Sequence, residues 1–211
     1  MIYLPIVLVG YLLGSIPWGF VLVGLVKGID VRKHGSGNIG ATNVVRIGGA
    51  PLGILAFILD AGKAALAVLV TRMLTDDPVA DVLAAGMVVI GHSWPVFLKF
   101  KGGRGIAAAC GGVGVLAPLA VGAGLFVFFV VVFTTRYSSL ASLAGVVVAV
   151  IGLGIGMAVD HYSLVYLIFG FVLALFLVVR HGANIRRLVK GTELRFGYSD
   201  KRRKRPGRSS S

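Results

Sequence analysis

The stretch IAAACGGVGVLAPLAVGAGLFVFFVVVF, residues 106–133, decides how many times this chain crosses a membrane. It is an uncharged run of 28 residues, longer than the ~20 that one helix needs to span a bilayer. Pro118 lies near its middle, and proline breaks a helix because it lacks an N–H donor and clashes with the preceding turn. We therefore expect two short helices that meet at Ala117–Pro118 and are partly sheltered by protein.

The chain is hydrophobic along most of its length. Its 211 residues are 57% hydrophobic, with a mean hydropathy of +0.93, which is more than a soluble domain of this size needs. The other apolar runs are 2–26, 52–74, 80–98, 139–158 and 163–180. The first run has no basic residue before it and no small-residue cleavage site, so we expect a retained span rather than a signal peptide. The composition predicts an all-α polytopic membrane protein.

The polar segments between these runs set the expected orientation. Segments 27–50 and 92–105 are rich in Lys and Arg, which the positive-inside rule places in the cytoplasm, whereas 72–81 carries three Asp against one Arg. The basic segment after residue 180 should also be cytoplasmic, which requires an odd number of spans. Counting 106–133 as two helices gives seven. We therefore predict a seven-span helical bundle with the N-terminus outside and the C-terminus cytoplasmic.

The net charge of +13 is concentrated at the C-terminal end. Residues 180–211 hold eleven Lys or Arg against Glu193 and Asp200, so +9 of the +13 lies there. Because this segment follows a membrane span, its basic run favours anionic lipid over nucleic acid as a partner. We expect an integral-membrane domain over 1–195 and a basic, disordered cytoplasmic tail over 196–211. The single cysteine excludes a disulfide framework within the chain, and we expect no metal and no cofactor.

The segment SGNIGATNVVR, residues 36–46, combines hydroxyl and amide donors, glycines and one arginine. These groups are suited to binding an anion, because hydroxyls, amides and open backbone N–H groups all donate and arginine adds a planar cation. A polar loop that only turns the chain uses the same residue types, and this alternative carries equal weight for the segment alone. The candidate phosphate ligands here are Ser36, Gly37, Asn38, Thr42, Asn43 and Arg46.

A second candidate site is KGGRG, residues 101–105, which leads directly into an apolar run. A glycine-rich turn that enters a helix presents free N–H groups and the positive end of the helix dipole. The segment lacks the GxxxxGK[ST] spacing of a nucleotide-binding loop. The alternative is a positively charged anchor beside flexible glycines. The candidate ligands are Lys101, Gly102, Gly103 and Arg104.

Further polar residues lie within or beside the apolar runs. Asp60 and Lys63 are three residues apart on one helical face, where they form either an internal ion pair or part of a site. Four residues follow the last run and either close the site from the cytoplasmic side or belong to an interfacial amphipathic segment: His181, Asn184, Arg187 and Glu193. His92, beside a glycine at the end of a run, is a weaker candidate for substrate binding.

The chain lacks the usual sets of groups for acyl-transfer chemistry. The polar segments expected in the cytoplasm offer no acidic pair, no GxSxG elbow is present, and no histidine is followed five positions later by Asp. The loops offer cations, amides and hydroxyls instead. Such a site suits a substrate that brings its own activated bond and its own phosphate.

Five sequence blocks together closely resemble the bacterial acyl-phosphate:glycerol-3-phosphate acyltransferase family, PlsY. These blocks are YLLGSIPWG at 11–19, GSGNIGATNVVR at 35–46, DAGKAA at 60–65, GHSWPVFLKFKGGRGIA at 91–107 and RHGANIRRLVKGTE at 180–193. They occur in the family's order at family-like spacing. One departure is Arg104, where the family usually has lysine, and the two cations differ in donor geometry.

The resemblance implies transfer of a fatty acyl group from acyl phosphate to the sn-1 hydroxyl of glycerol 3-phosphate, giving lysophosphatidic acid for phospholipid synthesis. It implies a multi-pass protein of the bacterial plasma (inner) membrane with its active site facing the cytoplasm. The expected partners of the protein are the two substrates and the membrane lipid around it, and we expect no nucleic acid partner. The residues expected to act in catalysis are Ser36, Arg46, Lys101, Arg104, His181 and Asn184. Which of the two phosphates each one binds stays open.

Two other functions fit parts of the sequence. A transporter for an anionic solute would also have positive loops and broken helices, but it would need polar groups through the membrane. A non-catalytic lipid-binding scaffold would not need so many phosphate ligands. The polar groups gather at one face of the predicted bundle, which favours the enzyme.

Overall fold

The computed structural model describes residues 2–197, and these fold into a bundle of helices. In this part of the chain the helices are α1 (Tyr3–Ser15), α2 (Trp18–Lys27), α3 (Ala41–Gly48), α4 (Ala50–Leu74), α5 (Pro78–Ser93), α6 (Ile106–Leu116), α7 (Pro118–Thr135), α8 (Ser138–Ala158), α9 (Leu164–Arg180) and α10 (Gly182–Val189), with 3-10 turns at Val31–Lys33 and Val96–Leu98. The predicted tail over 196–211 lies outside the described residues from 198 onward.

Several of these helices are long and apolar enough to cross a membrane. Five candidate spans are Tyr3–Lys27, Ala50–Leu74, Pro78–Leu98, Pro118–Thr135 and Ser138–Ala158. A sixth exists if α9 and α10, which are bent by 59° relative to one another, count as one span. With 11 residues, α6 is shorter than a span. The polytopic all-α prediction is confirmed, whereas the count of seven stays a prediction.

Two prolines interrupt the apolar runs. The predicted break at Ala117–Pro118 is confirmed, because α6 ends at Leu116 and α7 begins at Pro118. A second break, which we did not predict, separates α1 from α2 at Ile16–Pro17. Both breaks free backbone carbonyls inside an apolar bundle, where those groups need a hydrogen-bond donor.

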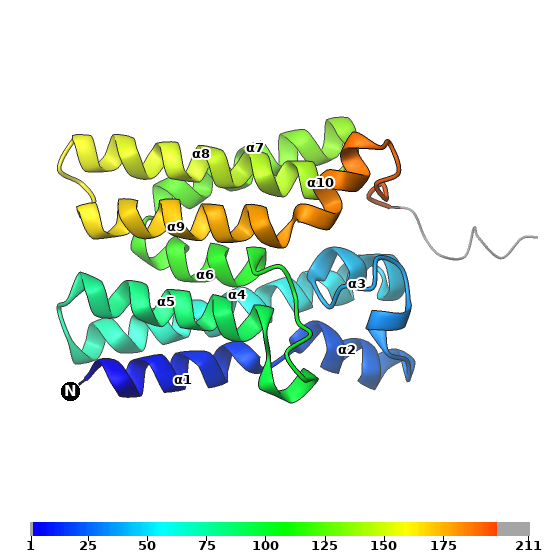
Figure 1. The fold of residues 1–211 in the computed structure, drawn as a ribbon, viewed down its shortest axis with the longest axis horizontal. Coiled ribbons are helices and arrows are strands. Elements are labelled where there is room, and N and C mark those ends of the chain that lie inside the picture. Colours follow the sequence, from blue (N-terminus) through cyan, green and yellow to red (C-terminus); the bar gives the residue numbers. More distant parts are fainter. Residues whose placement is uncertain (1, 198–211) are drawn as a thin grey trace, which may run out of the picture.

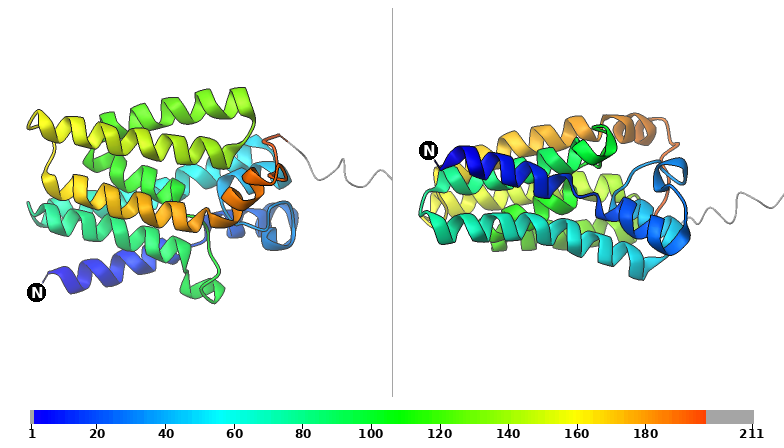
Figure 2. Two further views of the ribbon diagram at one scale, coloured as in Figure 1. Left: turned by 45° about the horizontal axis from the view of Figure 1, so that its top comes forward. Right: turned by 90° about the horizontal axis from the view of Figure 1, so that it is seen from below.

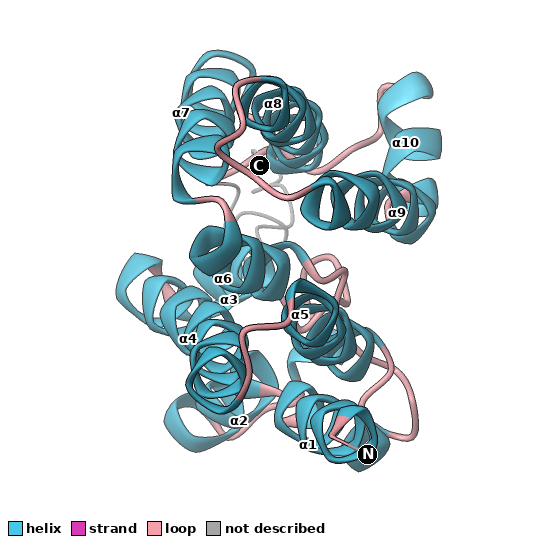
Figure 3. Ribbon diagram, turned by 90° about the vertical axis from the view of Figure 1, so that its left-hand side faces the viewer, coloured by secondary structure: helices cyan, strands magenta, loops and turns pink. Residues whose placement is uncertain are grey.

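The helices form two groups with α6 between them. Figures 1 and 3 show α1, α4 and α5 on one side and α7, α8 and α9 on the other. The central helix α6 contacts α4, α5, α7 and α9. Its approach to α4 is close, since a Cβ atom on Gly111 would lie 1.9 Å from the carbonyl oxygen of Ala61. Small residues allow this approach, as is usual where lipid-exposed helices pack.

The two ends of the bundle differ. Helices α2, α3 and α10 lie together at the end away from the N-terminus, which we call the polar end (Figures 1 and 2). The large apolar core cluster includes buried residues of α1 and α4–α9, and a smaller cluster packs the 28–40 loop against α3 and α4. The bundle therefore fixes the loops at its polar end, where the sequence motifs meet.

Candidate active site

Two adjoining cavities lie at the polar end. The larger, of about 600 Å³, starts among polar groups of α3, the 101–105 loop and His181, and continues between α6, α7, α8 and α9 along mainly apolar side chains. The smaller, of about 260 Å³, is polar and is lined by Ser36, Gly37, Asn38, Gly102, Arg104, Arg180, Ala183, Asn184 and Arg187. Ser36, Asn38 and Arg104 line both. The site thus joins an anion-binding mouth to an apolar chamber.

The 36–46 segment is organised by Asn43, whose side chain is buried. Its Nδ2 lies 2.8–3.3 Å from the carbonyl oxygens of Val31, His34 and Asn38, and its Oδ1 accepts from the Ser36 N–H at 2.8 Å. Asn43 therefore holds the loop with these groups while it also lines the larger cavity, and its expected contact with phosphate stays a prediction. Gly35 allows this, because its φ is +60° and a Cβ there would lie 2.2 Å from the Asn43 oxygen.

The remaining donors of this segment face the cavities. The Asn38 Oδ1 accepts from the Gly40 N–H at 2.9 Å, which orients the side chain and leaves its amide nitrogen as a donor. Ser36 lines both cavities, Gly37 lines the smaller one, and Thr42 in the first turn of α3 lines the larger. The anion site in this segment stays a prediction, with these donors as its candidate ligands.

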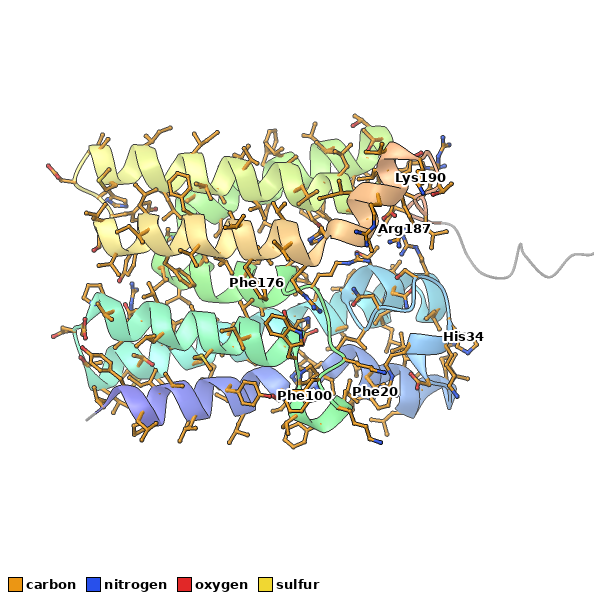
Figure 4. All side chains as sticks on the ribbon, viewed as in Figure 1. Phe20, His34, Phe100, Phe176, Arg187 and Lys190 are labelled. Atoms are coloured by element: carbon orange, nitrogen blue, oxygen red, sulfur yellow. The ribbon has the colours of Figure 1, made fainter. Side chains whose placement is uncertain are left out.

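Four arginines converge on the polar end. Burial, together with the nearby charges of Arg187, Arg46 and Arg180, lowers the pKa of Arg104 to about 10. Glu193 is the carboxylate that opposes them, so four positive charges against one negative leave an excess of three. Figure 4 shows Arg187 at the end of the bundle where α10 approaches α3. A phosphate dianion is the kind of ligand that relieves such a field.

Hydrogen bonds to backbone carbonyls orient two of these arginines. The Arg46 Nη2 donates to the Leu194 carbonyl at 3.1 Å, while its buried Nε has no protein partner among residues 2–197. The Arg180 Nη2 donates to the carbonyls of Ser93 (3.2 Å) and Gly103 (2.6 Å). Burial lowers the pKa of Arg46. Both guanidinium groups are thus fixed by the protein and retain donors for a ligand.

The structure divides the KGGRG segment. Arg104 and Gly102 reach the cavities, but the Lys101 side chain is exposed and lines neither, contrary to expectation. Gly103 is buried, and its N–H donates to the His92 carbonyl at 3.0 Å, so it shapes the loop. Arg180, which we did not predict, and Arg187, which we expected to help close the site, supply the additional cations of the smaller cavity.

A sequence signal for these two arginines exists in hindsight. Residues 180, 183, 184 and 187 follow the i, i+3, i+4, i+7 spacing of one helical face, and all four line the smaller cavity although the helix bends between α9 and α10.

His181 and Asn184 each present a hydrogen-bond acceptor. The His181 Nδ1 lies 2.7 Å from the Leu177 carbonyl oxygen, which can only accept, so Nδ1 carries the proton and Nε2 holds the lone pair. Burial lowers the pKa of His181 to about 4, so the ring is neutral near pH 7. The Asn184 Oδ1 is buried and has no protein partner among residues 2–197. His181 lines the larger cavity and Asn184 the smaller.

Glu193 positions its neighbours and lies outside both cavities. Its carboxylate accepts from Ser139 Oγ at 2.8 Å, from the Asn184 Nδ2 and from the Arg187 Nε at 2.7 Å. Burial alone would raise the pKa of Glu193, but these hydrogen bonds outweigh it and lower the pKa. Glu193, expected to help close the site, therefore acts on its neighbours, and its negative charge would repel a substrate phosphate.

Lys63 is engaged within the bundle. Its Nζ lies 2.8 Å from the Gly14 carbonyl, 2.6 Å from the Ile16 carbonyl and 2.8 Å from Asp60 Oδ1, and it lines neither cavity. The His92 Nδ1 lies 3.3 Å from the same Asp60 oxygen. Lys63 thus satisfies carbonyls freed at the α1–α2 break, and the internal ion pair is the alternative that the geometry supports. His92 lines the larger cavity.

The geometry defines a membrane-embedded enzyme that brings a phosphate-bearing polar substrate to an apolar chain. Residues 4–191 match the family model for glycerol-3-phosphate acyltransferase, and the chain belongs to this family. It is 44% identical over 192 residues to the glycerol-3-phosphate acyltransferase of Desulforamulus reducens, covering 91% of this chain and 94% of that one. It is 45% identical over 193 residues to that of Myxococcus xanthus, covering 90% and 98%.

Solved structures agree with this assignment. The chain is similar to a crystal structure of PlsY (YgiH), an integral membrane glycerol 3-phosphate acyltransferase, in its glycerol 3-phosphate form, with 38% identity, a TM-score of 0.84 and coverage of 92% of this chain and 96% of that one. The lysophosphatidic acid form gives 37% identity, a TM-score of 0.83 and coverage of 93% and 96%. The family resemblance expected from the sequence blocks is confirmed.

The Lys63→Met variant tests whether Lys63 supports the fold instead of binding substrate. It leaves Asp60 buried without its cation, so we expect a loss of about 3–5 kcal/mol in stability. Thermal unfolding of purified protein in detergent measures this, with Lys101→Met as the exposed control and Asp60→Asn/Lys63→Met as the variant that recovers stability. Unchanged stability together with a raised KM for glycerol 3-phosphate would assign Lys63 to the substrate.

Proposed function

We propose that this enzyme transfers a fatty acyl group from acyl phosphate to the sn-1 hydroxyl of glycerol 3-phosphate, releasing lysophosphatidic acid and inorganic phosphate. The observation that carries the proposal is a cluster of four arginines where two cavities join. Arg46 and Arg104 line the cavity of about 600 Å³, whose deeper part is apolar, and Arg180 and Arg187 line the smaller one beside it. One molecule that enters both parts must carry a phosphate and a hydrocarbon chain. The solved relatives, described in glycerol 3-phosphate and lysophosphatidic acid forms, support the same chemistry.

The two cavities suggest how the substrates divide. Glycerol 3-phosphate fits the smaller, wholly polar cavity, with its phosphate at Arg180, Arg187 and Asn38. The acyl phosphate fits the larger cavity, with its phosphate at Arg46 and Thr42 and its chain between the helices. Ser36 and Arg104, which line both cavities, lie where the two phosphates approach one another. Their donors offset the repulsion between two anions that must come close for the reaction.

The reaction itself needs one new bond and one broken bond. The sn-1 oxygen attacks the acyl carbonyl carbon, and the bond from that carbon to the phosphate oxygen breaks. Arg104 and the neighbouring donors stabilise the charge on the leaving phosphate. His181 Nε2 and Asn184 Oδ1 are free acceptors that hold the glycerol hydroxyls in place.

The proton of the sn-1 hydroxyl has two possible acceptors, His181 Nε2 and a substrate phosphate. The pKa of His181 is about 4, whereas the second pKa of a phosphate group is about 6. The proton therefore ends on phosphate, and His181 orients the nucleophile without being the final base. This assignment requires no carboxylate base. Asp60 lines the larger cavity, but its carboxylate lies against Lys63 and His92.

We also propose that the chain crosses the membrane seven times, with the polar end in the cytoplasm of a bacterial cell and the plasma membrane as its location. The N-terminus lies at the opposite end of the bundle from α3 and α10 (Figure 1). The loops of the polar end carry the excess of Lys and Arg, and the acidic residues 76, 77 and 81 lie near the other end. In this topology α6 and α7 act as two spans that meet at Pro118.

An assay with purified enzyme tests the proposed reaction. Palmitoyl phosphate and glycerol 3-phosphate should give lysophosphatidic acid, while palmitoyl-CoA at the same concentration gives none. Arg104→Gln should lower kcat/KM about 10–100-fold, because a hydrogen bond to a charged group contributes about 1.5–3 kcal/mol. Lys101→Gln is the matched control in the same loop and should stay within about twofold of wild type.

Equal losses in the Arg104 and Lys101 variants would contradict the placement of the phosphates. Product from palmitoyl-CoA but not from palmitoyl phosphate would contradict the donor. No product from either donor would favour an anion transporter.

The pH profile tests the role of His181. Because its pKa lies at about 4, the ring stays neutral as the pH falls to about 5, so its protonation cannot reduce activity above that value. Any inflection of kcat/KM near pH 6 then belongs to the substrate phosphate and should persist in His181→Asn, at a lower overall rate. An inflection near pH 6 that disappears in this variant would show instead that His181 is the titrating base.

A further inference from the structure

The apolar part of the larger cavity is a continuous channel built by four helices. Its lining residues recur at helical spacing, so each helix presents one face to the channel: Val121, Gly124, Leu125 and Phe128 on α7, and Gly170, Leu173, Ala174 and Leu177 on α9. Helix α6 contributes a face from Ile106 to Val113, and α8 one from Ser138 to Leu153. The channel therefore runs along the bundle axis away from the polar end.

Bulky and close-packed groups close the inner end of this channel. The lining residues furthest from the polar end are Val113 on α6, Val121 on α7, Leu153 on α8 and Gly170 on α9. The Leu153 side chain is only 2% exposed. A Cβ atom on Gly170 would lie 2.5 Å from Leu153 Cδ1, so this leucine lies directly against the glycine backbone. Leu153 and Gly170 thus form the floor of the channel.

The depth of the channel matches a lipid chain of ordinary length. Eleven residues separate His181 from Gly170, which corresponds to roughly 16 Å along a helix. The hydrocarbon core of a bilayer is about 30 Å thick, so each leaflet accommodates chains of about 15 Å. An acyl chain that fills one leaflet would therefore extend from the reacting carbonyl to the floor.

We propose that Leu153 and Gly170 determine the longest acyl chain that the enzyme accepts efficiently. The inference rests on the proposed function, because it assumes that the apolar channel holds the acyl chain of the donor. A chain that ends at the floor buries all its methylenes, and a longer chain must bend or leave its end outside. Each methylene gained or lost in such a pocket changes the rate about tenfold or more.

The acyl chain has a second possible route, through a lateral opening of the larger cavity. Ile54 on α4 and Phe129 on α7 line the same cavity and yet are 57% and 51% exposed. The cavity thus opens sideways between these two helices near the polar end. A chain that leaves there would enter the lipid and never meet Leu153. Changes in the floor should therefore alter the chain-length preference only if the chain follows the channel, and should leave it unchanged if the chain leaves sideways.

The test measures kcat/KM of the wild type and of two floor variants with lauroyl, palmitoyl and arachidoyl phosphate. Leu153→Ala deepens the channel and should raise the arachidoyl-to-palmitoyl ratio about tenfold. Gly170→Ala places a methyl group where Leu153 now lies, which raises the floor and should lower the palmitoyl-to-lauroyl ratio about tenfold. Leu140→Ala, on the same helix as Leu153 but outside the cavity, should leave both ratios unchanged.

The outcomes distinguish a failure of the proposed reaction from a failure of the assignment of Leu153 and Gly170. Wild-type enzyme that turns over none of the acyl phosphates would refute the proposed function itself. Normal palmitoyl turnover with unchanged ratios in both floor variants would overturn the assignment of Leu153 and Gly170 and favour the sideways route. If Leu153→Ala does not fold, Leu153→Val makes a smaller change in the same direction, and Gly170→Ala tests the floor independently.

Discussion

The structure depends on holding an excess of positive charge at the mouth of an apolar cavity. Glu193 opposes the charges of Arg46, Arg104, Arg180 and Arg187 there, and burial together with the neighbouring arginines lowers the pKa of Arg104 to about 10. Charges in a site of low polarity interact more strongly than in water, so the cluster repels itself unless an anion enters. Backbone carbonyls and Glu193 fix the arginines so that the binding energy of a phosphate is not consumed in ordering long side chains.

The helix breaks that shape this site create a second constraint. Pro17 and Pro118 end helices inside an apolar bundle and free carbonyl groups that lipid cannot satisfy. Lys63 donates to the carbonyls of Gly14 and Ile16 at the first break, and Arg72 donates to the Val115 carbonyl (3.1 Å) near the second. Both cations also pair with a carboxylate, Asp60 or Asp81. These ion pairs thus satisfy carbonyls of the irregular backbone, one beside the larger cavity, which Asp60 also lines, and one at the partly exposed Arg72.

The sequence predicts the architecture better than the ligand set. Run length and Pro118 reveal the helical membrane bundle and the break between α6 and α7. The break at Pro17 is missed because a run of ordinary span length gives no reason to divide it. Lys101 and Arg104 look alike in sequence, but only the folded loop shows that one points to solvent. Asn43 and Glu193 have the right groups for a site, but the folded loops supply partners for those groups, and one of them, Ser139, is 54 residues from Glu193.

The most direct measurement of the central claim is the thermal stability of the purified protein in phosphate-free buffer with increasing glycerol 3-phosphate. An anion that relieves the arginine cluster must stabilise the folded state as its concentration rises. The melting temperature should therefore increase with glycerol 3-phosphate, much less in Arg104→Gln, and not with glycerol at the same concentrations. An equal response to glycerol, or an unchanged response in Arg104→Gln, would contradict the account.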